Sequence, residues 1–392
     1  MRQLPRIGVD VKRVVRVRLR VTPAQSDALA RTLTACNHGA NLVSKLGFER
    51  GLRSKHGLQR LAYTQVRAQG LSSQPAIHAI RKTSGAYSTL HANAKAGNLG
   101  RRGSKRYEKA MGKPIQFRLD AAQPFDDRCL SWQMTAQTVS IWTVDGRMRG
   151  IPFAGDPDQL ARLKQFRQGE SDLVTHQGKW YLMATLDEPD PKMIDPAGFI
   201  GVDMGIVNIA TTSAGQNWSG KQINRVRHKN RRLRSTLQAK GTKSARRLLK
   251  KVSGREARFA ADTNHVISKR IVTEAKRTGR GIAVEDLTGI RARVRLRKPQ
   301  RVTLHSWAFA QLGAFLSYKA DAAGLPFVQV DPAYTSQQCS ACGHTQKKNR
   351  VDQATFVCRS CGVSLHADEN ASINIAKRGV DAWGAVTRPN AA

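Results

Sequence analysis

Residues 339–376 are the stretch of the chain that decides its fold. They contain C-S-A-C at 339–342, a gap of fifteen residues, C-R-S-C at 358–361 and, from residue 367, the helix-like segment A-D-E-N-A-S-I-N-I-A. Two such cysteine pairs suit the tetrahedral coordination of zinc, because an intervening hairpin brings the two short knuckles together. Four thiolates leave no open coordination position, so we predict a structural zinc ion held by Cys339, Cys342, Cys358 and Cys361.

Three acidic residues predict a second metal site. Asp203 ends the apolar run F-I-G-V-D, Glu285 ends I-A-V-E, and Asp368 stands at the start of the helix-like segment. An acid in an apolar strand is costly unless it is paired or bound to a cation, and sites form at the strand ends of open α/β sheets. Three converging carboxylates suit two magnesium ions roughly 4 Å apart. Such a pair activates a water and stabilises the leaving oxygen in phosphodiester hydrolysis. The acids therefore predict a metal-dependent nuclease.

Each acid taken alone has a simpler explanation. Asp203 could bond backbone amides in a turn, Glu285 and Asp286 could be a helix-capping or lysine-paired couple, and Asp368 could be an ordinary helix N-cap. The motif G-V-D-M-G is also similar to the phosphate-binding strand of actin-like kinases and ATPases. Only the combination of the three acids favours the nuclease.

The charge of the chain indicates a polyanionic partner. Its 392 residues include 66 Lys and Arg against 28 Asp and Glu, which leaves a formal net charge of +38. Self-repulsion of this size is naturally relieved by nucleic acid, which we favour over a merely solvated basic face.

Two basic segments are candidates for that contact. Residues 221–258 hold fifteen Lys or Arg and a single acid, Glu256, so the i,i+4 partners of an ordinary solvated helix are missing. Residues 291–301 form a second basic run soon after Glu285, and we interpret it as a loop that guides single-stranded substrate, with a surface loop as the alternative. The predicted nucleic-acid contacts are Arg225, Arg227, Lys229, Arg231, Arg232, Arg234, Arg246, Arg247, Arg291, Arg293 and Arg295.

Changes of pattern along the chain predict four parts. Residues 11–21 alternate basic and apolar, and later short runs, including P-I-Q-F-R-L at 114–119, predict further strands of the same β-barrel-like domain. A Pro-rich acidic join marks a boundary near residue 190. The predicted parts are a wedge β-barrel domain at 1–22 and 100–190, a helical domain at 23–99, an α/β domain at 195–335 and 366–392, and the zinc ribbon at 336–365.

The sequence also predicts the compartment. It has no run of eighteen apolar residues and begins without an apolar signal core, so we expect a cytoplasmic, nucleoid-associated protein with no membrane partner. Six cysteines, four of them in metal spacing, fit a reducing cytosol, and we interpret Cys36 and Cys129 as core residues.

Five motifs, in this order, give the chain a resemblance to a known family. G-V-D-M-G, A-V-E-D-L, Y-T-S-Q-Q-C-S-A-C-G, F-V-C-R-S-C-G and A-D-E-N-A-S-I-N-I resemble the split RuvC-like nuclease of transposon-encoded TnpB proteins and of miniature type V CRISPR effectors, which are Cas12-like. The resemblance covers roughly residues 198–380, and it implies an α/β RNase H-like fold with Asp203, Glu285 and Asp368 as the catalytic metal ligands. Arg350 would support that site. The amino-terminal half resembles the family only in architecture, as a wedge domain that carries a helical recognition insertion.

The resemblance also implies partners and a mechanism. Such proteins hold a guide RNA, which pairs with target double-stranded DNA beside a short flanking motif, and they are RNA-guided DNA endonucleases. The alternatives are an RNA-guided DNA-binding protein that represses without cutting and, less favoured, an actin-like ATPase. The motifs leave open a transposon or CRISPR origin, and a monomer or an asymmetric dimer.

Overall fold

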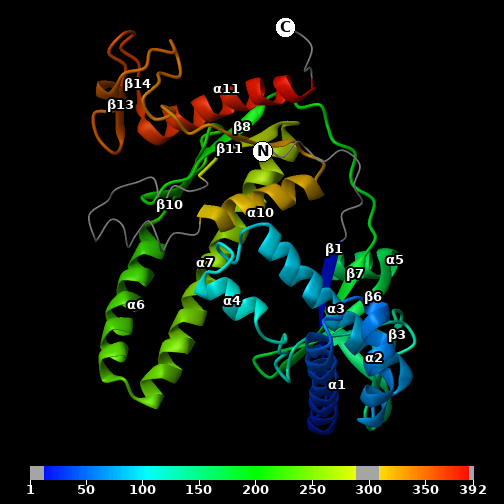
Figure 1. Ribbon diagram of the computed structural model, residues 1–392. Helices are drawn as coiled ribbons and strands as arrows, with labels where there is room; N and C mark the ends of the chain where they lie inside the picture. The colour runs from blue at the N-terminus through cyan, green and yellow to red at the C-terminus, as the bar shows by residue number, and fades with distance from the viewer. Residues whose placement is uncertain (1–12, 288–308, 388–392) are drawn as a thin grey trace. The chain divides into compact units, whose positions relative to one another are not determined.

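The computed structural model describes residues 13–287 and 309–387 (Figure 1). The chain divides into two compact units, and the division falls between Pro189 and Asp190. No helix in these residues is long and apolar enough to cross a bilayer.

The first unit contains an antiparallel sheet of seven strands that nearly closes into a barrel. Their order is β2-β6-β7-β1-β5-β4-β3. The strands are β1 (Arg13–Leu19), β2 (Gln123–Phe125), β3 (Leu130–Gln133), β4 (Thr138–Thr143), β5 (Gly146–Ala154), β6 (Arg167–His176) and β7 (Lys179–Leu186).

Strand β1 shows why the sequence alternates. Val15, Val17 and Leu19 are buried in the core of the first unit, while Arg16 and Arg18 point to solvent. β1 pairs antiparallel with both β5 and β7, so the first strand joins later strands across the intervening helices, as the alternation predicted.

The helices of the first unit follow β1. Thr22 caps the first of them through a capping box with Gln25, and Pro23 stands in its first turn. Asp156 caps another, because its side chain accepts hydrogen bonds from the backbone of Asp158 and Gln159. The helices are α1 (Pro23–Glu49), α2 (Lys55–Ala68), α3 (Ser73–Lys95), α4 (Lys105–Met111) and α5 (Pro157–Phe166).

The prediction of a strand at 114–119 was wrong. The backbone N–H of Phe117 donates to Asn41 Oδ1 at 2.7 Å, and its carbonyl accepts from Asn41 Nδ2 at 3.0 Å. A side chain of α1 therefore satisfies the backbone groups that a neighbouring strand would otherwise bond. The alternating pattern was real, but its hydrogen-bonding partner is a helix.

The second unit contains a mixed sheet of five strands in the order β10-β9-β8-β11-β12. β8, β11 and β12 are parallel to one another. β9 is antiparallel to β8, and β10 is antiparallel to β9. The strands are β8 (Phe199–Asp203), β9 (Asn208–Thr212), β10 (Asn217–Ser219), β11 (Gly281–Glu285) and β12 (Phe327–Val330).

Helices cover the two faces of this sheet. Ile200 and Val202 of β8 face the core that α7 and α10 share, whereas Phe199 packs with Ile375 of α11 on the opposite face. Figure 1 shows α6 and α7 as an antiparallel pair that extends beyond the sheet. The helices are α6 (Lys221–Lys240), α7 (Lys243–Arg277), α10 (Phe309–Ala322) and α11 (Ala367–Thr387).

The cysteine segment lies between β12 and α11. It contains a short 3-10 turn, η1 (Lys347–Asn349), and a two-stranded sheet of β13 (Thr355–Val357) and β14 (Ser364–His366). β14 ends at the residue that precedes α11. The ribbon is therefore continuous with the helix that carries Asp368.

Candidate functional site

Two of the three predicted acids lie at the same edge of the five-stranded sheet. β8 and β11 are adjacent and parallel, and Val202 pairs with Val284. Asp203 and Glu285 are the next residues of the two strands, so both stand at carboxyl ends. Sequence reasoning identified both residues, but their common register is visible only in the fold.

Asp368 reaches the same edge from α11. The helix packs directly on β8, because a Cβ at Gly201 would lie 2.0 Å from the carbonyl oxygen of Ser372. Asn208, the first residue of β9, donates from Nδ2 to Asp368 Oδ2 at 2.8 Å. A glycine and an asparagine thus fix the third acid beside the hairpin that begins with Asp203.

The charges of the three acids influence one another. Burial, and then the negative charges of Glu285 and Asp368, raise the pKa of Asp203 to about 8, while Arg350 and a backbone hydrogen bond act in the opposite direction. Such mutual repulsion in a buried position is relieved by a bound cation.

The carboxylates do not close around a single point. In the structure of residues 13–287 and 309–387, the carboxylate oxygens of the three acids do not all come within 4.8 Å of one another. One small cation would not touch all three in this arrangement. Two ions could share them, since a two-metal site spreads its ligands over ions about 3.5–4 Å apart.

Glu285 has its own support. Burial raises the pKa of Glu285, and the hydroxyl of Thr335, which donates to Glu285 Oε1, acts against that rise. Thr335 comes from the segment between β12 and the first cysteine pair. Neither Thr335 nor Asn208 was predicted, because each acts through a hydrogen bond to a residue far away in the chain.

Arg350 lies beside Asp368. Its Nη2 atom is 3.8 Å from Asp368 Oδ1, and the same guanidinium donates to the carbonyl oxygens of Asp352 and Gln353. Its side chain is 29% exposed and that of Asp368 is 9% exposed. A long ion pair at a partly open position adds little to the stability of the fold.

The four predicted cysteines come together. Their Sγ atoms lie within 4.8 Å of one another, and the distances Cys339–Cys361 and Cys342–Cys358 are both 3.6 Å. A tetrahedron with metal–sulfur bonds of about 2.3 Å has edges of about 3.8 Å. The cluster therefore fits a tetrahedral metal ion.

Each cysteine pair forms the same knuckle. Gly343 and Gly362 follow the pairs with φ of 76° and 75°, and their N–H groups donate to the carbonyls of Cys339 and Cys358. The backbone N–H of Cys361, and more weakly that of Ser360, lower the pKa of Cys358 to about 6. This favours the thiolate, which is the form that binds metal.

Two asparagines attach the ribbon to the helix of Asp368. Asn370 Nδ2 donates to the carbonyl of Gln338 at 2.8 Å, and Asn370 Oδ1 accepts from the backbone of Ser340. Asn374 Nδ2 also donates to the Gln338 carbonyl, at 2.6 Å. Both asparagines lie in the A-D-E-N-A-S-I-N-I motif, but their role was not predicted.

The predicted basic contacts lie mostly on α6 and α7. Arg227 is half-buried, and Arg234 pairs with Glu256 at 2.5 Å. Arg291, Arg293 and Arg295 lie outside the described residues. The exposed members are Arg225, Lys229, Arg231, Arg232, Arg246 and Arg247.

Two family models match the chain, almost entirely within the second unit. One, described as "Cas12f1-like, TNB domain", matches residues 309–375, and another, described as "Probable transposase", matches residues 183–291. Together they contain the three acids and the four cysteines. In these two regions the chain is similar to TnpB and miniature Cas12-like proteins.

Curated relatives match the chain over part of their length. The chain is 34% identical over 223 residues to the CRISPR-associated endodeoxyribonuclease Cas12f1 of Sulfoacidibacillus thermotolerans. The matched region covers 52% of this chain and 51% of that protein. The chain is 37% identical over 135 residues to a TnpB-like protein of Methanocaldococcus jannaschii, which covers 34% of this chain and 48% of that protein. The chain thus spans about half the length of these relatives.

The fold of the chain also resembles a solved structure over both units. A Cas12f1 protein, determined in a complex with sgRNA and target DNA, aligns with a TM-score of 0.58 and 16% identity. The alignment covers 91% of this chain and 83% of that one. At this identity the likeness speaks for the architecture alone.

Proposed function

We propose that the protein is an RNA-guided DNA endonuclease. The observation that carries the proposal is the approach of Asp203, Glu285 and Asp368 from β8, β11 and α11 to one edge of the sheet, with mutual repulsion that raises the pKa of Asp203. The Sulfoacidibacillus relative is named an endodeoxyribonuclease, and the Cas12f1 structure contains sgRNA and target DNA. Guide RNA and target double-stranded DNA are the partners that follow for this chain.

The proposed catalytic domain is RNase H-like. Its sheet has three parallel strands and an antiparallel hairpin, and the acids stand at strand ends and at a helix start. We assign residues 195–335 and 366–392 to this RuvC-like domain and residues 336–365 to the zinc ribbon. Residues 1–22 and 100–190 would form the wedge domain and residues 23–99 the recognition insertion.

Asp203, Glu285 and Asp368 would hold two magnesium ions. When bound, such ions supply an activated water and stabilise the leaving oxygen of a phosphodiester. The protein's own contribution is orientation: Thr335 holds Glu285, while Asn208 and Arg350 hold Asp368. Hard oxygen donors in this number suit magnesium.

Cys339, Cys342, Cys358 and Cys361 would hold one zinc ion in a structural role. Four sulfur ligands complete the tetrahedral coordination of zinc, so no position remains for a substrate. The ion would fix the ribbon, which in turn carries Arg350 to Asp368 and anchors Asn370.

A cleavage assay with matched variants tests the proposal. The full chain, purified with its copurifying RNA, should cut DNA that matches the guide in the presence of magnesium. Asp203→Ala and Asp368→Ala should lower the cleavage rate by at least about 10³-fold, a barrier change of about 4 kcal/mol, while guide and target binding stay within about twofold. Asp381→Ala is the control, because Asp381 is an exposed acid of the same helix, and it should cut at the wild-type rate.

Other results of that assay would favour the alternatives. Target DNA that is bound but uncut by the wild-type chain would indicate a guided DNA-binding protein, and magnesium-dependent ATP hydrolysis would indicate an actin-like ATPase. Sequencing the copurified RNA would tell a transposon-end transcript from a repeat-spacer transcript.

A further inference from the structure

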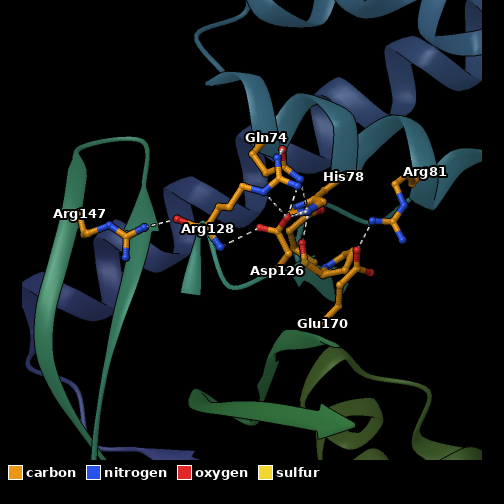
Figure 2. Close-up of polar contacts among 9 residues, drawn as sticks. Gln74, His78, Arg81, Asp126, Arg128, Arg147 and Glu170 are labelled. Atoms are coloured by element: carbon orange, nitrogen blue, oxygen red, sulfur yellow. Dashed lines mark hydrogen bonds and ion pairs between the residues drawn. The ribbon is translucent and has the colours of Figure 1, made fainter. Parts of the chain in front are cut away.

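A second group of metal-ligating side chains lies in the first unit. His78 of α3, with Asp126 and Cys129 of the turn between β2 and β3, brings one ligand atom each within 4.8 Å of the others. His78 is 0% and Cys129 is 3% exposed. Figure 2 shows His78 and Gln74, both from α3, pointing toward Asp126. These residues have no part in the proposed nuclease site or in the ribbon.

Local structure presents these side chains together. The carbonyl of Asp126 accepts from the N–H groups of Cys129 at 3.0 Å and Leu130 at 2.8 Å, so D-D-R-C forms a tight turn. Gln74 and His78 are four residues apart on α3, and this spacing places them on one face of the helix. Two side chains from one helix and two from one tight turn thus face each other, as the ligands of a metal site do.

The Gln74 amide lies between the ligands. Its Nε2 atom donates to Asp126 Oδ2 at 2.6 Å and lies 3.3 Å from His78 Nε2, which is 3.6 Å from the same carboxylate oxygen. An amide that donates to both requires a lone pair on His78 Nε2 and therefore a proton on Nδ1. The N–H group of Gln74 therefore stands where a cation could bind, between a carboxylate oxygen and an imidazole lone pair. It is a weak substitute for a cation, because an amide carries no net charge.

Hydrogen bonding within the fold leaves one nitrogen of His78 unsatisfied. Its Nδ1 atom is buried and has no hydrogen-bond partner among the residues that the structure describes. A buried polar atom without a partner is costly, and a histidine placed only for packing would be expected to satisfy both nitrogens. A gain from ligation through Nε2 would offset that cost.

We propose that His78 Nε2, an oxygen of Asp126 and Cys129 Sγ bind a zinc ion. Rotation of the Gln74 amide turns its oxygen toward the ion as the fourth ligand. One nitrogen, one sulfur and two oxygens suit zinc, and the thiol of Cys129 releases its proton to solvent when the ion binds. The proposal is independent of the endonuclease assignment, since none of these residues contributes to that site.

Charge and exposure permit this binding. Arg128, whose Nε lies 3.5 Å from Asp126 Oδ2, has a 78% exposed side chain and can turn into solvent when the ion takes its place. Arg81 is already paired with Glu170. The ion's two positive charges would be balanced by the carboxylate of Asp126 and the thiolate of Cys129. The result is a link that holds α3 to the sheet.

Zinc counting on the full, untagged chain tests the proposal. After equilibration against a buffer that fixes free zinc at a low level, elemental analysis should find two zinc ions per wild-type chain. Cys129→Ser and His78→Gln should each lose one. Cys36→Ser is the control, because Cys36 is an equally buried cysteine, at 0% exposed, that lies outside the cluster. It should keep both ions.

Cobalt substitution gives an independent reading. In the Co²⁺-loaded protein, His78→Gln should remove one tetrahedral cobalt spectrum and leave the intense charge-transfer bands of the four-cysteine site. A zinc count that His78→Gln does not lower would overturn the proposal. So would an unchanged cobalt spectrum in that variant, and either result decides even where Cys129→Ser fails to fold.

Discussion

At the scale of single residues, the proposed site depends on carboxylates that the fold keeps close together at a cost. Asp203 experiences burial and two neighbouring acids, and only Arg350 and one backbone hydrogen bond oppose the rise of its pKa to about 8. Asp203 and Glu285 could be singled out from sequence, because a charge in an apolar strand is unusual, and Asp368 through its place in a helix-like motif. Their polar supports, Asn208 and Thr335, could not, since each acts through one long-range hydrogen bond.

The raised pKa of Asp203 predicts a pH-dependent affinity for magnesium. Without the ion, the carboxyl keeps its proton at neutral pH, so binding must release that proton and the affinity should rise as the pH approaches about 8. Calorimetric titrations in buffers of different ionisation enthalpy would measure the proton release. Asp203→Asn should remove it, and a magnesium affinity that is flat between pH 6 and 8 would contradict the expectation.

The same shift predicts how stability without magnesium depends on pH. The folded pKa of Asp203 lies above the ordinary value of 3.8, so the folded state holds this proton more tightly than the unfolded state. The resulting stability is present at low pH and is lost as the pH rises through about 8. Thermal unfolding with and without magnesium should show a stabilisation by the ion that grows from pH 6 to pH 8.5, and Asp203→Asn should reduce that growth.

At the scale of elements, the packing of α11 on β8 sets the position of Asp368. Gly201 has no room for a Cβ. A Cβ added at Gly379 of α11 would likewise lie only 2.6 Å from the Cβ of Ala283 in β11. The helical period of 367–387 and the apolar run of β8 were predictable from sequence. Their close packing was not, because a glycine in a strand can equally mark a bulge.

Gly201→Ala should therefore displace α11. Because the clash is with backbone atoms, we expect a loss of unfolding free energy of about 1–3 kcal/mol or more, together with a large loss of cleavage. Gly313→Ala in α10 is the control, since no atom lies within 4 Å of its added Cβ and alanine favours a helix. Chemical denaturation would measure both variants, and equal stability would rule out the close packing.

The ribbon predicts a coupling between zinc and catalysis. Removal of zinc by a chelator should loosen the segment that holds Arg350 near Asp368, so cleavage should fall even when magnesium is saturating. Calorimetric unfolding should show a lower Tm for the second unit, with recovery when zinc is restored. If the Tm of the second unit stays the same once the ribbon has lost its zinc and can no longer bind it, a structural role for this ion is contradicted.

At the scale of the whole molecule, the net charge of +38 is the dominant property. Within residues 221–258 of α6 and α7 the only acid is Glu256, which pairs with Arg234. A surface of this kind neutralises phosphates rather than reading bases. Composition predicted this property directly, because charge is additive and needs no knowledge of the fold.

Nucleic-acid affinity should therefore fall steeply with salt. Replacing Arg225, Lys229 and Arg232 by alanine should reduce the slope of log affinity against log salt by about 0.7–0.9 for each phosphate that the protein no longer neutralises. Arg277→Ala is the control, because Arg277 lies at the end of α7 and pairs with Glu274 at 2.7 Å. Binding measured from low to moderate salt would test this, and an unchanged slope in the triple variant would exclude this surface.

The sequence by itself determined the chemical inventory: four cysteines in metal spacing, two acids at the ends of apolar strands and a third at a helix start, the excess of positive charge and the periods of most helices and strands. These features are local or additive, so they can be read without knowing which segments touch. Only the tertiary structure decided that Asp203 and Glu285 share a register, that Asn41 satisfies the backbone near Phe117, and that Gln74 lies 2.6 Å from Asp126, 52 residues away. Such arrangements depend on strand pairing and helix packing across the chain, and no short window of sequence specifies them.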